Sequence, residues 1–325
     1  MSWLLLGIPV GIIVLYFGSG WMVDGAKKMA IRLGISPFTV GLTVVAMGLA
    51  APEAATSLIS GDPQILIGNI VGSNIANIGL AIGIAALIYP VFCIYYEIRY
   101  DALIMVAAIL IVSVMALTGS LGMIEGVILL ICLFLFILYT LKYTKDTVCT
   151  VCQEGETEDE VVEDSLKTPM WKCILLVAAG IILLFIGVTA FINGATELAG
   201  MIGVPDLMTG LVIVAFGVCL PELCVCIAAA RRHENEILVS NIIGSIVFNC
   251  FFALGLGVLF TEVTVTHNII IFHLPVMILI AVLLVLFIRF SNRITRWQGA
   301  VMVSFYAVYI LLMILFPELT QGLVE

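Results

Sequence analysis

The sequence has 325 residues, of which 63% are hydrophobic and 11% carry a charged side chain. Soluble domains have about 45–50% apolar and about 25% charged residues, so this composition excludes a soluble globular protein. The formal net charge of −9 comes mostly from one polar loop and says little about partners. The chain is therefore predicted to be an all-α membrane protein.

Ten apolar stretches are long enough to cross a bilayer as helices. They cover residues 3–23, 37–60, 66–92, 101–118, 121–141, 171–192, 207–230, 236–260, 268–289 and 297–316. The first stretch is too long and too rich in glycine for the apolar segment of a signal peptide. We expect it to be the first transmembrane helix.

The basic residues predict the orientation of these helices. All thirteen fall on one side of the ten-helix arrangement: Lys27, Lys28, Arg32, Arg99, Lys142, Lys145, Lys167, Lys172, Arg231, Arg232, Arg289, Arg293 and Arg296. Because Lys and Arg concentrate in cytoplasmic loops, these loops are predicted to be cytoplasmic and both termini to lie outside. We expect a multi-pass protein of the cell membrane, surrounded by lipid, with no nucleic acid and no obligatory protein partner.

A thirteen-residue pattern occurs twice. It reads GLTVVAMGLAAPE over Gly41–Glu53 and GLVIVAFGVCLPE over Gly210–Glu222, with seven identical positions. Proline lacks an amide donor and clashes with the preceding turn, so each helix is expected to unwind or kink at Pro52 and Pro221. The first pattern spans roughly 18 Å of helix, which places Glu53 near the middle of a hydrocarbon layer about 30 Å thick. A carboxylate at this depth is costly and indicates function.

A second pattern follows each Pro-Glu pair. Residues 68–77 read GNIVGSNIAN and residues 240–249 read SNIIGSIVFN, with five identical positions. Ser73 and Asn77 are one helical turn apart, as are Ser245 and Asn249, so each pair lies on one face of its helix. We expect these polar faces to pack against the two broken helices.

The duplication divides the chain into an N-terminal five-helix repeat, residues 1–142, and a C-terminal five-helix repeat, residues 170–325. Because five is odd, the second repeat must enter the membrane upside down. The expected fold is ten transmembrane helices in two inverted repeats, with helices 2 and 7 broken. Residues 143–169 form an acidic cytoplasmic linker, either a solvated tether or a cation-sensing segment.

With these motifs, the chain resembles the cation/calcium exchanger superfamily, in particular the prokaryotic sodium/calcium exchangers. That superfamily carries G-[TS]-[TS]-x-P-E and G-N-x-x-G-S-N-x-x-N motifs in two inverted repeats. The resemblance implies that Glu53 and Glu222 are the main calcium ligands, and that carbonyls of Leu49 and Val218 complete the site. It also implies sodium binding, or lining of the centre, by the carbonyls of Ala46 and Ala215 and by Ser73, Asn77, Ser245 and Asn249.

The chain departs from the family motif at Leu49, Ala50, Val218 and Cys219, where the family has Thr and Ser. Hydroxyl oxygens suit hard sodium ions, whereas aliphatic side chains offer no ligand and a thiol is a soft one. Asn249 also stands where these exchangers often have an acid. The sequence therefore predicts weakened sodium sites beside a calcium site that retains two carboxylates.

The predicted function is that of a secondary antiporter, not an enzyme, which exchanges calcium for sodium by alternating access at the two glutamates. Calcium and sodium are then transported ions, and no resident cofactor is expected. A proton-coupled antiporter of calcium or another divalent cation is the alternative. The sequence has no H-E-x-x-H motif and no aspartyl dyad, which argues against an intramembrane enzyme. A cation channel would need a continuous polar pore, whereas the sequence has one compact polar cluster in each half.

The remaining polar residues of the apolar spans are assigned structural roles. His273 is predicted to be a satisfied packing residue, with a proton relay as the alternative. Spans four, five, nine and ten are expected to form a supporting wall. The nine cysteines are expected to be reduced thiols, most of them packed as small hydrophobes.

Overall fold

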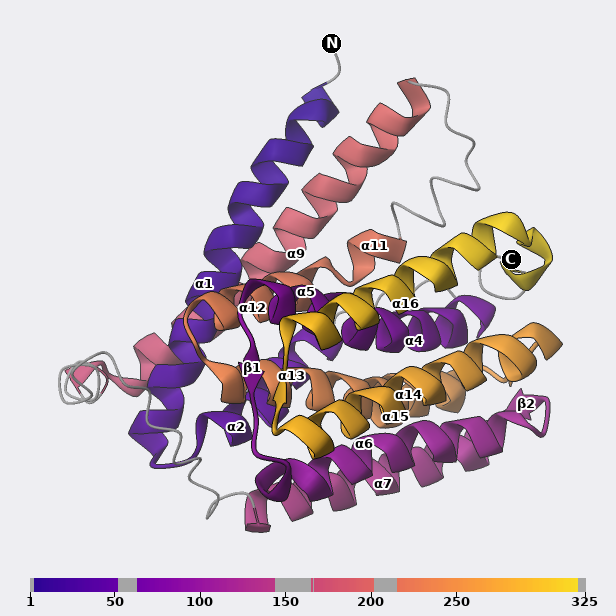
Figure 1. Cartoon of the computed structure of the whole chain (residues 1–325), viewed down its shortest axis with the longest axis horizontal. Helices are drawn as coiled ribbons and strands as arrows, with labels where there is room; N and C mark the ends of the chain where they lie inside the picture. The colour runs from indigo at the N-terminus through magenta and orange to yellow at the C-terminus, as the bar shows by residue number, and fades with distance from the viewer. Residues whose placement is uncertain (1–2, 52–62, 144–164, 166, 202–214, 321–325) are drawn as a thin grey trace.

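The computed structural model describes residues 3–51, 63–143, 165, 167–201 and 215–320. In these residues it is helical throughout, apart from four strands of two residues each. Eight helical segments are long and apolar enough to cross a membrane: Leu4–Leu33, Leu66–Ile88, Tyr95–Ala116, Met123–Lys142, Met170–Met201, Asn235–Phe260, Ile269–Ser291 and Arg296–Leu315. The prediction of an all-α membrane protein is confirmed (Figure 1).

The elements follow the chain in two runs. The first run contains the 3-10 helix η1 (Trp3–Leu6), α1 (Gly7–Leu33), α2 (Pro37–Val40), the π-helix η2 (Gly41–Val45), α4 (Pro63–Ala76), the π-helix η3 (Asn77–Ile82), α5 (Gly83–Ile88), β1 (Val91–Phe92), α6 (Tyr95–Ala116), β2 (Ser120–Leu121) and α7 (Met123–Tyr143). The second contains α9 (Met170–Met201), α11 (Ala215–Val218), α12 (Leu220–Arg231), α13 (Asn235–Phe248), the π-helix η6 (Asn249–Ala253), α14 (Leu254–Phe260), β3 (Val263–Thr264), the π-helix η7 (Ile269–His273), α15 (Leu274–Ser291), β4 (Arg293–Ile294), α16 (Arg296–Leu315) and the 3-10 helix η8 (Pro317–Thr320).

The two other predicted spans are described in part. Residues 37–60 begin as the apolar helix Pro37–Ala51, and residues 207–230 contain α11 and α12. Pro52, Glu53 and most of the acidic linker lie outside the described residues. The fourth span begins at Tyr95, six residues before the prediction, because Arg99 stacks on the rings of Tyr96 and Tyr100 instead of ending the helix.

Local sequence signals set several helix ends. The Ser36 hydroxyl accepts a hydrogen bond from the Thr39 N–H and precedes Pro37, which suits the first helical position. Gly34 ends α1 in the left-handed conformation, with a φ of 64°. Thr295 and Gln298 form a reciprocal capping box at the start of α16.

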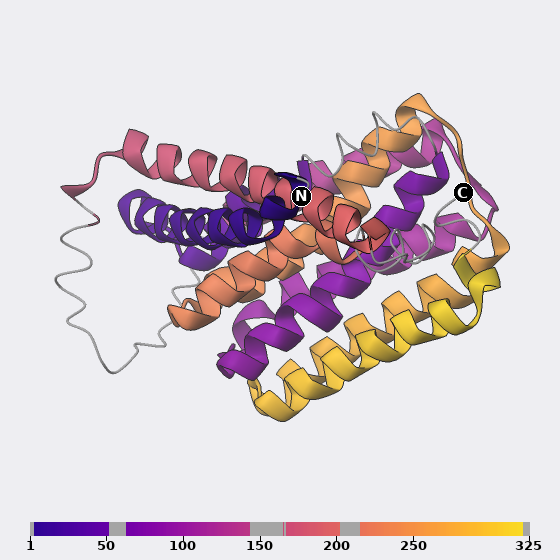
Figure 2. The same cartoon turned by 90° about the horizontal axis from the view of Figure 1, so that it is seen from above.

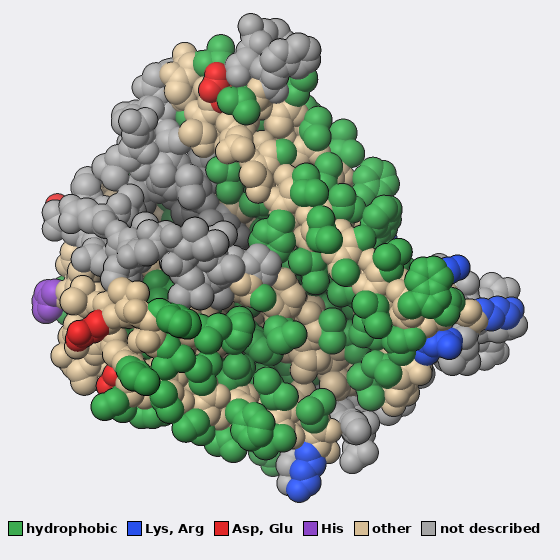
Figure 3. Space-filling view, turned by 180° about the vertical axis from the view of Figure 1, so that it is seen from behind, with side chains coloured by type: hydrophobic (Ala, Val, Ile, Leu, Met, Phe, Trp, Pro, Cys, Tyr) green, Lys and Arg blue, Asp and Glu red, His purple; other side chains and the backbone are tan. Residues whose placement is uncertain are grey.

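Two short antiparallel strand pairs connect the two runs of elements. Strand β1 pairs with β4, and β2 pairs with β3. The end of the molecule that carries β1 and β4 is called the basic end here, because Lys27, Arg232, Arg293 and Arg296 lie there. Figure 3 shows Lys and Arg side chains along one side of the visible face and Asp, Glu and His on the other, with hydrophobic side chains between them.

Helices α1 and α9 lie side by side and cross the other helices obliquely (Figures 1 and 2). Small residues allow their backbones to approach closely. A Cβ atom added to Gly187 would lie 3.0 Å from the Gly11 carbonyl oxygen, and one added to Gly180 would lie 2.8 Å from that of Gly18. The two helices therefore form one closely packed pair.

His273, in the ninth predicted span, has local hydrogen-bond partners. His273 contacts the Tyr309 hydroxyl at 2.9 Å and the Leu319 carbonyl oxygen at 2.8 Å, which confirms it as a satisfied packing residue. The seven described cysteines are free thiols. Cys93, in the loop after β1, is buried, and burial raises the pKa of its thiol to about 12.

Candidate functional site

Helix α13 packs tightly against the first copy of the repeated pattern. A Cβ atom added to Gly244 would lie 2.5 Å from the Leu42 carbonyl oxygen and 2.6 Å from the Ala46 Cβ atom. Glycine at position 244 is therefore required for this approach. One Ser/Asn helix therefore packs, through Gly244, against the helix that carries the first copy of the pattern.

The second copy of the pattern is interrupted at Cys219. Helix α11 ends at Val218, and α12 begins at Leu220 with Pro221 in its first turn. Cys219 is buried, and its thiol donates to the Phe216 carbonyl oxygen at 3.1 Å. The interruption brings the N-terminus of a twelve-residue helix into the protein interior.

Glu222 lies in the first turn of α12 and is only 1% exposed. The helix N-terminus favours negative charge, because its amide groups point toward the start of the helix. A carboxylate removed from water also needs a cation or several hydrogen-bond donors close by. Glu222 is therefore suited to hold a positive charge that approaches from the interior.

Asn249, at the start of η6, bonds across to the first run of elements. Its side-chain amide nitrogen donates to the Ser73 hydroxyl at 3.2 Å and to the side-chain oxygen Oδ1 of Asn74 at 3.1 Å. The Asn74 amide donates in turn to the Cys250 sulfur at 3.5 Å. All four side chains are buried, and this network joins the two Ser/Asn motifs at the centre of the protein.

Asn77 and Ser245, the other two members of the Ser/Asn motifs, are not part of this network. Both are fully buried, and neither the amide of Asn77 nor the hydroxyl of Ser245 has a hydrogen-bond partner among the described residues. Asn77 starts η3 and Ser245 lies on α13, and both of these elements pack against each other and against α12. Three mutually packed elements thus bring Glu222, Asn77 and Ser245 to one region. Buried polar atoms of this kind are expected to bind water or an ion.

The other predicted site residues are placed as follows. Ala46 and Leu49 are fully buried on the helix Pro37–Ala51, whereas Ala215 and Val218 are the first and last residues of α11. Glu53 lies outside the described residues. Within the described ranges, no three His, Cys, Asp or Glu side chains are grouped in a way that could hold a metal ion. Any pairing of Glu53 with Glu222 therefore remains a prediction.

Two features near the centre had no signal in the sequence. Asn77 and Asn249 each begin a π-helical segment, and such segments often occur at functional sites. Tyr306 of α16 packs against Gly79, whose added Cβ atom would lie 2.8 Å from the Tyr306 Cβ atom. The predicted supporting wall thus reaches η3, two residues from Asn77.

The second of the two glycines shared by both copies of the thirteen-residue pattern leaves space for a side chain of α9. An added Cβ atom at Gly48 would lie 2.5 Å from Ile181, and Ile192 occupies the same place beside Gly217. Helix α9 therefore contacts both motif helices.

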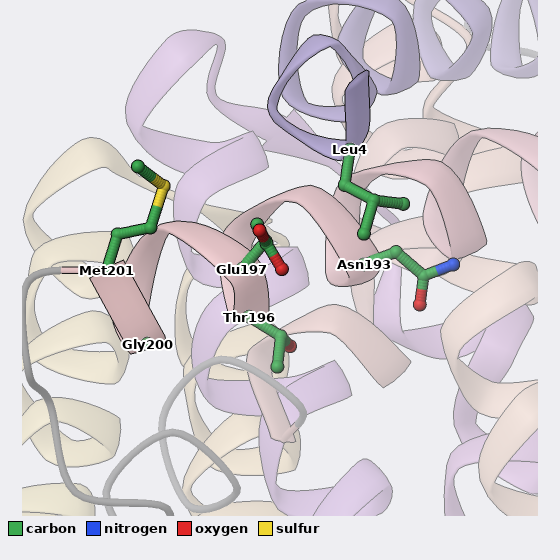
Figure 4. A pocket seen from close by; sticks show the side chains of 6 residues that line it. All are labelled: Leu4, Asn193, Thr196, Glu197, Gly200 and Met201. Atoms are coloured by element: carbon green, nitrogen blue, oxygen red, sulfur yellow. The ribbon is translucent and has the colours of Figure 1, made fainter. Parts of the chain in front are cut away.

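A cavity lies at the far end of α9 from the basic end (Figure 4). Leu4, Asn193, Thr196, Glu197, Gly200 and Met201 line it. Glu197 is half-buried beside this cavity.

Ion pairs connect α1 to the loop between α12 and α13 at the basic end. Arg232 contacts the Asp24 carboxylate at 2.9 Å and donates to the Gly20 carbonyl oxygen, and Lys27 pairs with Glu234 at 2.5 Å. A Cβ atom at position 20 would lie 3.0 Å from the Arg232 guanidinium. The glycine therefore leaves room for this contact.

A membrane-embedded fold with a buried carboxylate and amide centre is typical of an ion transporter. The chain belongs to the sodium/calcium exchanger protein family, whose profile matches residues 3–142 and 172–315. The family predicted from the motifs is thus confirmed.

Two archaeal relatives match nearly the whole chain. The sodium/calcium exchanger MaX1 of Methanosarcina acetivorans is 32% identical over 94% of this chain and 96% of its own. The uncharacterized membrane protein MJ0091 of Methanocaldococcus jannaschii is 32% identical over 94% of this chain and 98% of its own. The named activity of MaX1 is exchange, and the family is one of transporters, not enzymes.

Solved structures share the fold. The sodium-calcium exchanger NCX_Mj soaked with 10 mM Na⁺ and zero Ca²⁺ matches with a TM-score of 0.81 and 30% identity, over 95% of this chain and 99% of that one. The same exchanger soaked with 10 mM Na⁺ and 10 mM Sr²⁺ gives a TM-score of 0.79 over 95% and 98% of the two chains.

The different bonding of Asn249 and Asn77 predicts different mutant phenotypes. Asn249→Ala leaves Ser73 and Asn74 without their donor, so the protein should lose about 2 kcal/mol or more of stability in ion-free buffer. Asn77→Ala should cost less there, but should reduce the increase in melting temperature on addition of sodium. Thermal unfolding of both purified variants, with and without sodium, measures this difference. Equal behaviour of the two variants in both buffers would contradict the assignment.

Proposed function

We propose that the protein exchanges calcium for sodium across the membrane, by alternating access to a central site built on Glu53 and Glu222. The observation that carries this proposal is the buried Glu222 carboxylate at a helix interruption, next to elements that present the unpartnered groups of Asn77 and Ser245. MaX1 and NCX_Mj, which match nearly the whole chain, are described as sodium/calcium exchangers. Basic loops are proposed to be cytoplasmic, with both termini outside.

An inverted repeat of ten helices, with helices 2 and 7 broken, is part of this proposal. Several paired features support it. The strand pair β1 and β4 has its counterpart in β2 and β3, and each Ser/Asn motif ends in a π-helix that begins at its asparagine. The second Pro-Glu helix is divided at Cys219. In such repeats the ion site lies between the two copies near the bilayer midplane.

Charge balance explains how one site could serve both ions. Two glutamates neutralise one calcium ion or two sodium ions, whereas an empty pair of carboxylates would be costly to bury. The carrier therefore crosses between its two states mainly when the charge is compensated. Protons could compensate the same charge, which keeps proton-coupled transport as the alternative.

The site chemistry favours calcium over sodium. Leu49 and Ala50 supply no side-chain oxygen, and the Cys219 thiol is engaged with the Phe216 carbonyl oxygen. Asn249 and Ser73 bond to each other. The calcium ligands proposed here are the two glutamates and the backbone carbonyls of Leu49 and Val218. Sodium is left with the carbonyls of Ala46 and Ala215 and with Asn77 and Ser245.

Alternating access requires contacts that form in one state and break in the other. We assign this role to the ion pairs that connect α1 to Arg232 and Glu234 at the basic end. The opposite end of the partner helix α9 lines the cavity of Figure 4. The basic end is held by ion pairs, and the opposite end contains a cavity. This arrangement is consistent with a state that is closed toward the cytoplasm.

Neutralising Glu222 tests the central site. Glu222→Gln keeps the size of the side chain but removes a charge that the neutral oxygens nearby cannot replace, so calcium uptake into vesicles should fall at least a hundredfold. Glu125→Gln is the matched control, because Glu125 accepts a hydrogen bond from the Gly122 N–H at a helix start, far from the centre. Calcium uptake by Glu222→Gln at the wild-type rate would refute the proposed site.

Charge reversal tests the ion pairs at the basic end. Lys27→Glu places two carboxylates together, so the state open to the cytoplasm should become up to about fivefold more populated, as expected for about 1 kcal/mol from a partly exposed pair. The half-saturating calcium concentration at the cytoplasmic face should fall accordingly. The double variant Lys27→Glu with Glu234→Lys should restore the wild-type value. Failure of the second reversal to restore it would contradict the role of this pair.

A further inference from the structure

Asn241 is a buried amide that the central site does not use. It lies on α13, one helical turn before Ser245, and is fully buried. Neither its amide nitrogen nor its carbonyl oxygen has a hydrogen-bond partner among the described residues. Leaving such a group unpaired in the protein interior is destabilising.

The position of Asn241 relates it to both the centre and the basic end. Helix α13 begins at Asn235, whose side chain accepts a hydrogen bond from the Phe92 N–H of β1. Asn241 is roughly 9 Å along the helix from that end, and Ser245 is roughly 6 Å farther in. Asn241 therefore lies between the central site and the loops of the basic end.

Cys226 of α12 lies beside Asn241. It is one helical turn from Glu222 in the direction of Arg231, and it is a fully buried free thiol. Glu222 and Ser245 are thus each followed, one turn toward the basic end, by a further polar group. The two helices carry matched polar positions at two depths.

The packing of α13 shows which way these positions face. Ser240 and Gly244 contact η2 on one side of the helix, where Ser240 occupies the space beside Gly41. Asn241 follows Ser240 by one residue, and Ser245 follows Gly244 by one residue. Asn241 and Ser245 therefore lie about 100° farther around the helix, toward α12. A continuous polar strip therefore runs along the contact between α12 and α13.

We propose that Asn241, with the Cys226 thiol, forms a polar step at which a partly hydrated cation pauses between the central site and the cytoplasm. The inference rests on the proposed transport function. An amide carbonyl oxygen is a suitable ligand for sodium or calcium, and the amide N–H groups can hold the waters that the ion keeps. The step lowers the cost of removing those waters before the ion reaches Glu222.

Substitution of Asn241 separates this role from a structural one. Asn241→Leu removes an unpaired buried amide, so on structural grounds alone it should leave stability unchanged or raised and transport intact. The polar step predicts instead at least a tenfold fall in the calcium uptake rate, with equilibrium calcium binding by the purified protein within twofold of wild type. Asn241→Ser, which keeps an oxygen, should retain at least a third of the rate.

The outcomes of this substitution are decisive. Wild-type uptake by Asn241→Leu would overturn the proposal. Loss of calcium binding in proportion to uptake would place Asn241 in the central site and would also overturn a separate step.

Thiol labelling tests the same step without measuring transport. The other cysteines are replaced so that Cys226 alone remains, and inside-out vesicles are treated with a trimethylammonium-ethyl methanethiosulfonate reagent. A variant with Cys173 alone is the control, since Cys173 is equally buried but lies on α9. Labelling of Cys226 at least tenfold faster than Cys173, and slowed by saturating calcium, supports the step.

Equally slow labelling of the two cysteines would overturn the proposal.

The same experiments distinguish failure of the polar step from failure of the proposed sodium/calcium exchange. If sodium does not drive calcium uptake but calcium still slows labelling of Cys226, the exchange function is wrong and the polar step stands.

Discussion

The burial of a carboxylate in a bilayer is the constraint on which the rest of the structure depends. Glu222 is almost completely removed from water, in a chain that exposes many large hydrophobic side chains. The cost of such a charge must be offset by a helix N-terminus, by polar groups from other helices and by a cation. The interruption at Cys219 supplies the first of these, because it starts a helix inside the protein. We propose that Asn77 and Ser245 supply the second, because η3 and α13 both pack against that helix.

Close helix packing brings these groups together. Gly244 lets α13 reach the backbone at Leu42, and Gly48 and Gly217 receive isoleucine side chains from α9. The same helix α9 is packed along α1 through facing glycines, and α1 is held at the basic end by Arg232 and Glu234. A movement of the α1 and α9 pair would therefore be transmitted directly to both motif helices. This arrangement connects the surface ion pairs to the buried site through contacts alone.

Hydropathy allowed the membrane fold to be predicted. The Pro-Glu and Ser/Asn patterns, which each occur twice, singled out Glu222, which is buried, and its role as an ion ligand stays a prediction. The sequence could not distinguish Asn249 from Asn77. Both are buried asparagines at matched positions, and only the packing between halves decides that Asn249 bonds to Ser73 and Asn74 while Asn77 does not. The π-helical segments were also missed, because the helix pattern continues through them. The linker and Glu53 remain predictions, since they lie outside the described residues.

We propose that sodium is the driving ion and that it binds at a site that also binds calcium. Radiolabelled calcium uptake into vesicles of the purified protein, driven in parallel by an outward sodium gradient and by an outward proton gradient, tests it most directly. The sodium gradient is expected to drive uptake against the calcium gradient. Uptake driven by protons and unaffected by sodium would show that sodium is not the driving ion.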